Sequence, residues 1–246
     1  MDTYFKALKQ ILEGKDDITF FSGAGLSTSA GLPDFRSDEN GFWKSNSPVH
    51  FSDFLSSKAF RQKSWQNNIA IHKKIKNTKP TKMHNLVNKV LKRRSNNFHI
   101  TQNIDGLHRS KDNENNIIEL HGSIFKAQCL ECNAEYETLE YFKKLNTGED
   151  FICSSCQKGF IKVSTISFGQ ALAPESLEKA ENASMNCKFF IVLGSSLKVS
   201  PANNFLRIAK DNGAKIIILN KDLTPMDNYA DIVINECLEN IYEEIK

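Results

Sequence analysis

Four of the six cysteines are spaced as metal ligands. Cys129 and Cys132 form one Cys-x-x-Cys pair, Cys153 and Cys156 form another, and 20 residues lie between the pairs. Two such pairs supply four thiolates in a tetrahedral arrangement, which suits Zn²⁺. A redox dithiol or coincidental spacing is the alternative, although a redox motif needs only one pair. Because four thiolates leave no position for water, we expect one zinc ion that stabilises the fold and performs no chemistry.

The remaining cysteines and the apolar segments indicate the compartment. Cys187 and Cys237 lie beside apolar segments and are interpreted as packed thiols. The stretch from Met1 to Lys6 lacks the basic start and apolar core of a secretory signal. The longest apolar run, Phe189 to Leu193, has five residues, whereas a membrane span needs about 20. We therefore expect a cytoplasmic protein with reduced thiols and no membrane segment.

A glycine-rich turn from Ser22 to Thr28 follows the apolar strand predicted at 18–21. Gly23 and Gly25 would let the backbone approach a phosphate, and a helix beginning near Ser27 would direct its N-terminal amides at that charge. The same pattern also occurs as a plain strand-to-helix turn. No apolar strand ending in Asp or Glu follows about 20 residues later, which disfavours a dehydrogenase that transfers hydride.

Polar side chains follow two further strand patterns. Gln102 to His108 comes directly after the strand predicted at 98–101, and His121 follows the apolar run 117–120. A loop with an acid, an aromatic ring and a cation, Asp34 to Arg36, lies just beyond the glycine-rich turn. A lone histidine after an apolar run is often structural. Because the carboxyl ends of parallel strands meet at one edge of a sheet, we instead expect these side chains to share a ligand cleft.

Strand and helix patterns alternate along most of the chain. Apolar residues at helical spacing predict a helix around Phe5 to Leu12 and another around Met83 to Leu91. This alternation is typical of a parallel sheet covered on both faces, so we expect an open, Rossmann-like α/β fold. Further strands are predicted at 189–193 and 215–219, and further helices at 175–183, from Pro201 and from about Glu236.

Two segments interrupt the alternation and predict a smaller lobe. Residues 37–79 show helical patterns only, and residues 125–162 carry the cysteine pairs. We expect one domain over 1–246, with a large lobe of about 1–36, 80–124 and 163–246. The helical insertion of about 37–79 and the zinc module of about 125–162 then form the small lobe, with a ligand cleft between the lobes.

The charge is unevenly distributed, although the net charge is only +3. The stretch from Lys58 to Arg94 contains twelve Lys and Arg residues and no Asp or Glu, while 222–244 is acidic. Such a stretch is typical of a solvated helix face. Contact with nucleic acid is the alternative, and it is disfavoured because no interleaved aromatic residues or nucleic-acid motif accompany the charge.

Together these segments resemble the sirtuins, the NAD-dependent protein lysine deacylases, and especially their compact bacterial members. The resemblance covers nearly the whole chain. It implies the fold described above, a structural zinc ion and NAD as co-substrate. It rests on Gly23 to Thr28, Gly31 to Arg36, Thr101 to His108, His121-Gly122, both cysteine pairs, Ser167 to Gly169, Gly194 to Leu197, and Asn220.

The resemblance implies where NAD binds. The pyrophosphate is expected on the glycine-rich turn, nicotinamide between Phe35, Ile104 and Asp105, and the adenosine near the loops that follow the last strands. The full set of expected NAD-binding residues is Gly23, Ala24, Gly25, Thr28, Asp34, Phe35, Arg36, Gln102, Asn103, Ile104, Asp105, His121, Gly194, Ser195, Ser196, Asn220, Lys221, Cys237 and Leu238.

The resemblance also implies the reaction. The carbonyl oxygen of acyl-lysine attacks C1′ of the nicotinamide ribose and expels nicotinamide. His121 then acts as general base on a ribose hydroxyl that attacks the acyl carbon, while Asn103 orients the ribose or the attacking water. A neutral imidazole with an ordinary pKa of about 6.5 suits this role. The products are lysine, nicotinamide and O-acyl-ADP-ribose, and the substrate peptide pairs with the edge formed by Ile166, Ser167, Phe168 and Gly169.

Three positions depart from the pattern of the family. Ser195 replaces a common threonine and keeps its hydroxyl. Gln170 replaces a common glutamate, and the segment 162–165 lacks a proline that is often present. These changes leave the expected catalytic groups intact and leave the peptide preference open.

The helical insertion predicts the acyl group. Family members that remove succinyl or malonyl groups carry Tyr-x-x-Arg there, and this chain contains no Tyr-x-x-Arg. Counting from Trp65, the corresponding positions are Asn68 and Ile71, which would leave a buried carboxylate without a cation. We therefore expect acetyl or longer aliphatic groups. The alternative is that a cation such as Arg61 or Lys73 swings in.

Two other classes of function compete. An NAD glycohydrolase or ADP-ribosyltransferase would use the same pocket, but simple NAD hydrolysis needs no base at His121. A non-enzymatic zinc module could bind nucleic acid or protein through the basic stretch, but it would leave Asn103, Asp105 and His121 unexplained.

Overall fold

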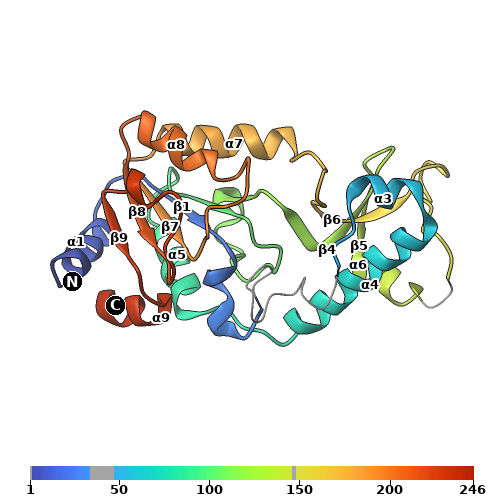
Figure 1. The fold of residues 1–246 in the computed structure, drawn as a ribbon, viewed down its shortest axis with the longest axis horizontal. Helices are drawn as coiled ribbons and strands as arrows, with labels where there is room; N and C mark the ends of the chain where they lie inside the picture. The colour runs from blue at the N-terminus through green and yellow to red at the C-terminus, as the bar shows by residue number, and fades with distance from the viewer. Residues whose placement is uncertain (1, 34–46, 146–147) are drawn as a thin grey trace.

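The computed structural model describes residues 2–33, 47–145 and 148–246. A parallel sheet of six strands forms the centre of the large lobe, in the order β3-β2-β1-β7-β8-β9 (Figure 1). This arrangement confirms the predicted open α/β sheet. The strands are β1 (Ile18–Ser22), β2 (Phe98–Thr101), β3 (Ile117–Glu119), β7 (Phe189–Leu193), β8 (Lys215–Leu219) and β9 (Ile232–Ile234).

Helices cover both faces of this sheet. Strand β7 is continuously apolar because both of its faces are buried. Phe189, Ile191 and Leu193 pack into one core, while Phe190 and Val192 pack into the other. The first core is covered by α1 (Asp2–Glu13), α5 (Lys82–Leu91) and α9 (Leu238–Ile245). The second is covered by α7 (Pro174–Met185) and α8 (Asn204–Asp211), at the top of Figure 1.

The described helices include none that combines the length and apolar character needed to cross a bilayer.

A small lobe lies beside the sheet, at the right of Figure 1. Its strands form an antiparallel sheet in the order β5-β4-β6. Sequence patterns did not predict this sheet, because β5 has only three residues and β4 shifts register between Gly122 and Ala127. The lobe contains β4 (Gly122–Cys129), β5 (Glu135–Glu137), β6 (Ile161–Thr165), α3 (Phe51–Ser56), α4 (Lys58–Ile75) and α6 (Thr138–Phe142).

Helix α4 joins the two insertions into one lobe. The indole of Trp65 packs 5.5 Å from the ring of Tyr141, and its Nε1 donates a hydrogen bond of 3.2 Å to the carbonyl of Ile161. Arg61 donates from Nε and Nη2 to both carboxylate oxygens of Asp150, at 2.9 and 2.8 Å. A paired, two-bond contact of this kind sets the orientation of the helix as well as its position.

Two predicted helix starts are wrong. The residues after the glycine-rich turn form two short 3₁₀ turns, Ala24–Leu26 and Thr28–Ala30, and the second ends at Gly31 with a left-handed φ of 87°. Pro201 lies in a turn, and α8 begins only at Asn204. The terminal helix predicted from about Glu236 is confirmed and begins at Leu238, where the extended backbone of Cys237 ends.

We predict that the sheet core dominates stability. Phe190 is 0% exposed and its ring stacks 5.9 Å from that of Phe21. Phe190→Ala should lower the free energy of unfolding by about 3–5 kcal/mol. The matched control is Phe60→Ala, at a side chain that is 40% exposed, which should cost less than about 1 kcal/mol. Urea denaturation of both variants tests this, and equal losses would contradict the assignment of the core.

Candidate active site

The predicted site residues gather at the carboxyl edge of the parallel sheet, in the loops after β1, β2, β3 and β7. The amide of Gly25 donates to the carbonyl of Gly194 at 2.9 Å. Ser195 Oγ donates to Gln102 Oε1 at 2.9 Å. These contacts connect the loop after β7 with the loops after β1 and β2, as the strand order requires.

Glycine is required where two of these loops touch. A Cβ at Gly25 would lie 2.7 Å from Cα of Gly194, and Gly194 itself has a left-handed φ of +57°. No real Cβ fits at such a distance. The glycines of the turn therefore serve the contact between β1 and β7, in addition to any contact with a phosphate.

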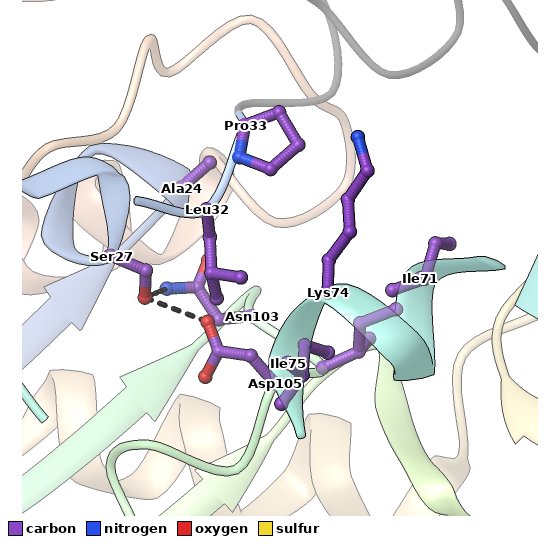
Figure 2. A pocket seen from close by; sticks show the side chains of 10 residues that line it. Ala24, Ser27, Leu32, Pro33, Ile71, Lys74, Ile75, Asn103 and Asp105 are labelled. Carbon is purple, nitrogen blue, oxygen red and sulfur yellow. Dashed lines mark hydrogen bonds between the residues drawn. The ribbon is translucent and has the colours of Figure 1, made fainter. Parts of the chain in front are cut away.

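Asn103, Ser27 and Asp105 form a buried hydrogen-bonded group. Ser27 Oγ donates to Asp105 Oδ2 at 2.7 Å, and Asn103 Nδ2 lies 3.3 Å from Ser27 Oγ (Figure 2). Asn103 Nδ2 also donates to the carbonyl of Gly23 at 3.0 Å. The group fixes the amide and the carboxylate relative to the glycine-rich turn.

A pocket opens above this group, between the large lobe and α4. Asp105 and Asn103 supply its polar wall, and Ile71 and Ile75 face them from α4 (Figure 2). The pocket is thus apolar with a few convergent polar atoms, which is typical of a small-molecule site. Its lining consists of Ala24, Ser27, Leu32, Pro33, Ile71, Lys74, Ile75, Asn103, Ile104 and Asp105.

The backbone of the β2 loop sets the tautomer of His121. Nδ1 of His121 lies 3.0 Å from the carbonyl oxygen of Gln102. A carbonyl oxygen can only accept, so Nδ1 carries the proton in the neutral ring. Nε2 is then the nitrogen with the lone pair, which is the arrangement that a general base needs.

Gly122 brings the end of β6 beside this histidine. A Cβ at Gly122 would lie 1.7 Å from the carbonyl oxygen of Ser164, so only glycine allows β4 and β6 to pair there. Just beyond this pair, the amide of Ile166 donates to the carbonyl of His121 at 3.0 Å. The segment predicted to bind a peptide therefore begins next to the predicted base.

Gln170 shapes the rest of that segment. Its side-chain Oε1 accepts from the backbone amide of Ser167 at 3.1 Å, and its backbone amide donates to the Ser167 carbonyl at 3.0 Å. Phe168 is 39% exposed, and its carbonyl accepts from the amide of Phe51 at 2.9 Å. An amide side chain thus holds this turn.

The residues expected near adenosine lie in the loops after β7, β8 and β9. The amide of Asn220 donates to the carbonyl of Ile234 at 3.2 Å. Cys237 is exposed in the extended residue directly before α9, so its interpretation as a packed thiol is wrong, whereas Cys187 is buried as expected. Leu238 is buried in the first core. Ser196 and Lys221 are exposed beside them, and Thr28 is exposed with its hydroxyl donating to the carbonyl of Gly25 at 3.1 Å.

Cys129, Cys132, Cys153 and Cys156, called here the cysteine cluster, come together in the small lobe. All four Sγ atoms lie within 4.8 Å of one another, with separations of 3.7 Å from Cys129 to Cys156 and 3.6 Å from Cys132 to Cys153. Four sulfurs around one Zn²⁺ at the usual bond length of about 2.3 Å would lie about 3.8 Å apart. The cluster therefore fits a tetrahedral ion.

The two turns of the cysteine cluster repeat the same geometry. Asn133 and Gln157, each the residue after the second cysteine of a pair, have left-handed φ angles of 60° and 59°. Backbone amides donate to the sulfurs, for example Cys132 N to Cys129 Sγ at 3.4 Å. Such donors favour the thiolate form that a metal ion needs.

Sequence reasoning found most of the motif residues but missed several contacts. Asp34, Phe35 and Arg36 lie outside the described residues. Ser27 was expected only as the start of a helix after the glycine-rich turn, and its bond to Asp105 has no signal in spacing alone. Lys74 lines the pocket, whereas Lys73, the named alternative, is exposed and does not line it.

Comparisons with known proteins agree with these observations. Residues 23–201 match the family model "Sir2 family". The chain is 35% identical to an NAD-dependent protein deacetylase of Rhodopseudomonas palustris over 230 residues, covering 92% of this chain and 90% of the relative. It is 32% identical to NAD-dependent protein deacylase 2 of Archaeoglobus fulgidus over 250 residues, covering 100% and 98%.

A solved structure has the same fold. The structure of Sir2 with a p53 peptide and NAD⁺ superposes with a TM-score of 0.85 and 28% sequence identity, covering 98% of this chain and 96% of that one.

Proposed function

This chain belongs to the Sir2 family and is an NAD-dependent protein lysine deacylase, and we propose that His121 is its general base. The observation that carries this assignment is the 3.0 Å contact between Nδ1 and the carbonyl of Gln102. It leaves Nε2 as the basic nitrogen of the neutral ring. Neutral His121 can then accept a proton from a hydroxyl placed at Nε2.

The loops at the sheet edge are suited to hold NAD. Its phosphates fit against the turn from Gly23 to Gly25, where the glycines let a ligand approach the backbone, and its adenosine fits the ends of β7 and β8 at Ser195 and Asn220. When bound, NAD would supply an electrophilic ribose carbon with nicotinamide as the leaving group, and its ADP-ribose part would accept the acyl group, so the reaction is an acyl transfer.

Asp105 and Asn103 are suited to two neighbouring parts of NAD, the nicotinamide carboxamide and the ribose. The Asp105 carboxylate can accept a hydrogen bond from a carboxamide, and the apolar wall of Ile104 excludes water beside it. Asn103 is 3% exposed and held by Gly23 and Ser27, so its amide can orient a ribose hydroxyl or a water without swinging away.

The peptide is expected on the segment from Ile166 to Gly169. This segment leaves the antiparallel sheet beside His121. The Ile166 amide, both backbone groups of Ser167 and the Phe168 carbonyl already have partners, so an extended peptide would add through the remaining backbone groups of the segment. The exposed ring of Phe168 offers an apolar contact to a side chain of the peptide.

The cysteine cluster is proposed to hold one Zn²⁺ in a structural role. All four ligands are protein thiolates, and the cluster packs against Trp65 in a core of its own. The ion would join the turns at Cys129 and Cys153, and so brace the sheet that presents the peptide segment.

An NAD glycohydrolase or an ADP-ribosyltransferase remains the second candidate. The position of Ile166 beside His121 favours deacylation, since a peptide edge next to the base serves no purpose in simple NAD hydrolysis. Release of nicotinamide that does not require an acyl-lysine peptide would favour the second candidate.

The lobe boundaries at about 36, 79, 124 and 162, a cytoplasmic location, and the absence of nucleic-acid binding stay predictions from the sequence.

We predict that His121→Ala abolishes deacylation but keeps NAD binding. Loss of the base should lower kcat by at least about 100-fold, because general bases contribute on that scale. Calorimetry should show a Kd for NAD within about threefold of the wild type, since the glycine-rich turn is unchanged. Mass spectrometry of O-acyl-ADP-ribose measures the activity, and product formation at the wild-type rate would overturn the role of His121.

We predict one Zn²⁺ per chain, bound by the cysteine cluster. Cys129→Ala should lose the ion and lower the unfolding midpoint by roughly 10 °C or more. Cys237→Ala, at an exposed cysteine outside the cluster, should keep both. Metal analysis of protein purified without chelator measures the ion. A stable, fully active Cys129→Ala protein would show that the cluster is less important than proposed.

We predict that acetyl-lysine or a longer fatty acyl-lysine is preferred to succinyl-lysine. Ile71 and Ile75 line the pocket, and each buried CH₂ of an acyl chain contributes about 0.8 kcal/mol. Asn68 does not supply a cation, and its Oδ1 accepts from Thr165 at 3.3 Å. Arg61 is bound to Asp150, so it is an unsuitable partner for an acyl carboxylate.

Competition assays with matched peptides measure kcat/KM for each acyl group. A preference for succinyl-lysine would contradict the apolar pocket. In that case the variant Lys74→Met tests whether Lys74, which lines the described pocket, is the cation that binds the succinyl carboxylate.

A further inference from the structure

Three histidines are buried close to Asp105, and the reaction outlined above does not use them. They are His84 on α5, His99 on β2 and His108 in the loop that follows β2. The rings of His99 and His108 are nearly perpendicular, with centroids 5.9 Å apart. Within the described residues, one nitrogen of each ring has no hydrogen-bond partner: Nε2 of His84, Nδ1 of His99 and Nδ1 of His108.

His108 lies between two carboxylates. Its Nε2 is 2.7 Å from Glu119 Oε1, and its Nδ1 is 3.7 Å from Asp105 Oδ1. Arg109 binds both oxygens of Glu119 through Nε and Nη2. With a neutral His108, this group would carry one excess negative charge at a site where the imidazole is 0% exposed. A protonated His108 makes the group neutral, which is the less costly state for buried charges.

The three rings differ in their charge. Burial lowers the pKa of His84 to about 4, and it lowers the pKa of His99 well below its usual value. Burial alone would also lower the pKa of His108, but the interactions with Asp105 and Glu119 outweigh it and raise that pKa. Burial thus favours the neutral form of His84 and His99, while the two carboxylates favour the protonated form of His108.

Asp105 depends on this cation. Its Oδ2 accepts from Ser27 and its Oδ1 accepts from the amide of Leu107 at 2.9 Å, but both donors are uncharged. Among the described residues, the cation within 4.0 Å of this carboxylate is His108. Burial would raise the pKa of Asp105, and the interaction with His108, together with these hydrogen bonds, lowers it instead.

We propose that His108, as an imidazolium between Asp105 and Glu119, is a positioning residue that keeps Asp105 ionised and oriented for the carboxamide of NAD. This rests on the proposed function, in which Asp105 contacts nicotinamide. Because the pKa of His108 is raised, the ion pair is complete below that pKa and is lost as the pH rises through it. The KM for NAD should therefore rise on the alkaline side, while the KM for the peptide does not.

The first test observes the imidazole directly. In NMR titrations of protein with labelled histidine, one ring should titrate above 6.5, and its signal should be absent in His108→Gln. Glu119→Gln removes one carboxylate and should lower that midpoint by about one pH unit. A His108 ring that titrates at or below 6.5 in the wild-type protein would overturn the proposal, whatever activity the enzyme has.

The second test is kinetic. His108→Gln should raise the KM for NAD about tenfold and abolish its alkaline rise, with the KM for an acetyl-lysine peptide within twofold of the wild type. An equal rise in both KM values, or a loss confined to kcat, would indicate a merely structural role and overturn the proposal.

An exposed partner keeps the test independent of folding. Arg109→Gln leaves Glu119 to pair with His108 alone, so the alkaline rise in KM for NAD should move to higher pH. Lys92→Gln removes a cation from the exposed ion pair with Asp112 and should leave the pH profile unchanged. An unmoved pH profile of the KM for NAD in Arg109→Gln would contradict the proposal.

A wild-type protein without deacylase activity would instead refute the proposed function, and the NMR titration would still test His108.

Discussion

The close contact between Gly25 and Gly194 is the constraint on which the site depends. It allows the loop after β1 to touch the loop after β7, where any side chain would force them apart. From there a series of bonds continues through Ser195 to Gln102 and from Gln102 to His121. The orientation of the imidazole is thus set by backbone packing two strands away.

Much of the large lobe was predictable, because its strands are buried on both faces and read as apolar runs. β2, β7 and β8 were predicted with the bounds that the structure shows. The small sheet was not predictable, because β5 has three residues and exposes two of them, and β4 carries a register shift. A helix was predicted to begin near Ser27, but the Ser27 hydroxyl donates to Asp105 and does not cap a helix.

The candidate site was likewise predictable only in part. Cysteine spacing predicted a cluster because the ligands of one ion must be close, and the structure brings all four sulfurs together. Contacts between distant loops have no such spacing rule. The pairing of His108 with Glu119 and the position of Lys74 at the pocket depend on how elements pack, which only the assembled fold shows.

The bonds of α4 also have a consequence for synthesis of the chain. Arg61 binds a residue 89 positions later, and Trp65 binds one 96 positions later. At about 5–20 residues per second, a ribosome needs several seconds to supply those partners. During that interval the indole side of α4 is exposed to solvent. The acid-free run of lysines and arginines around it would then act as a set of gatekeepers, whose mutual repulsion keeps nascent chains apart until the small lobe closes.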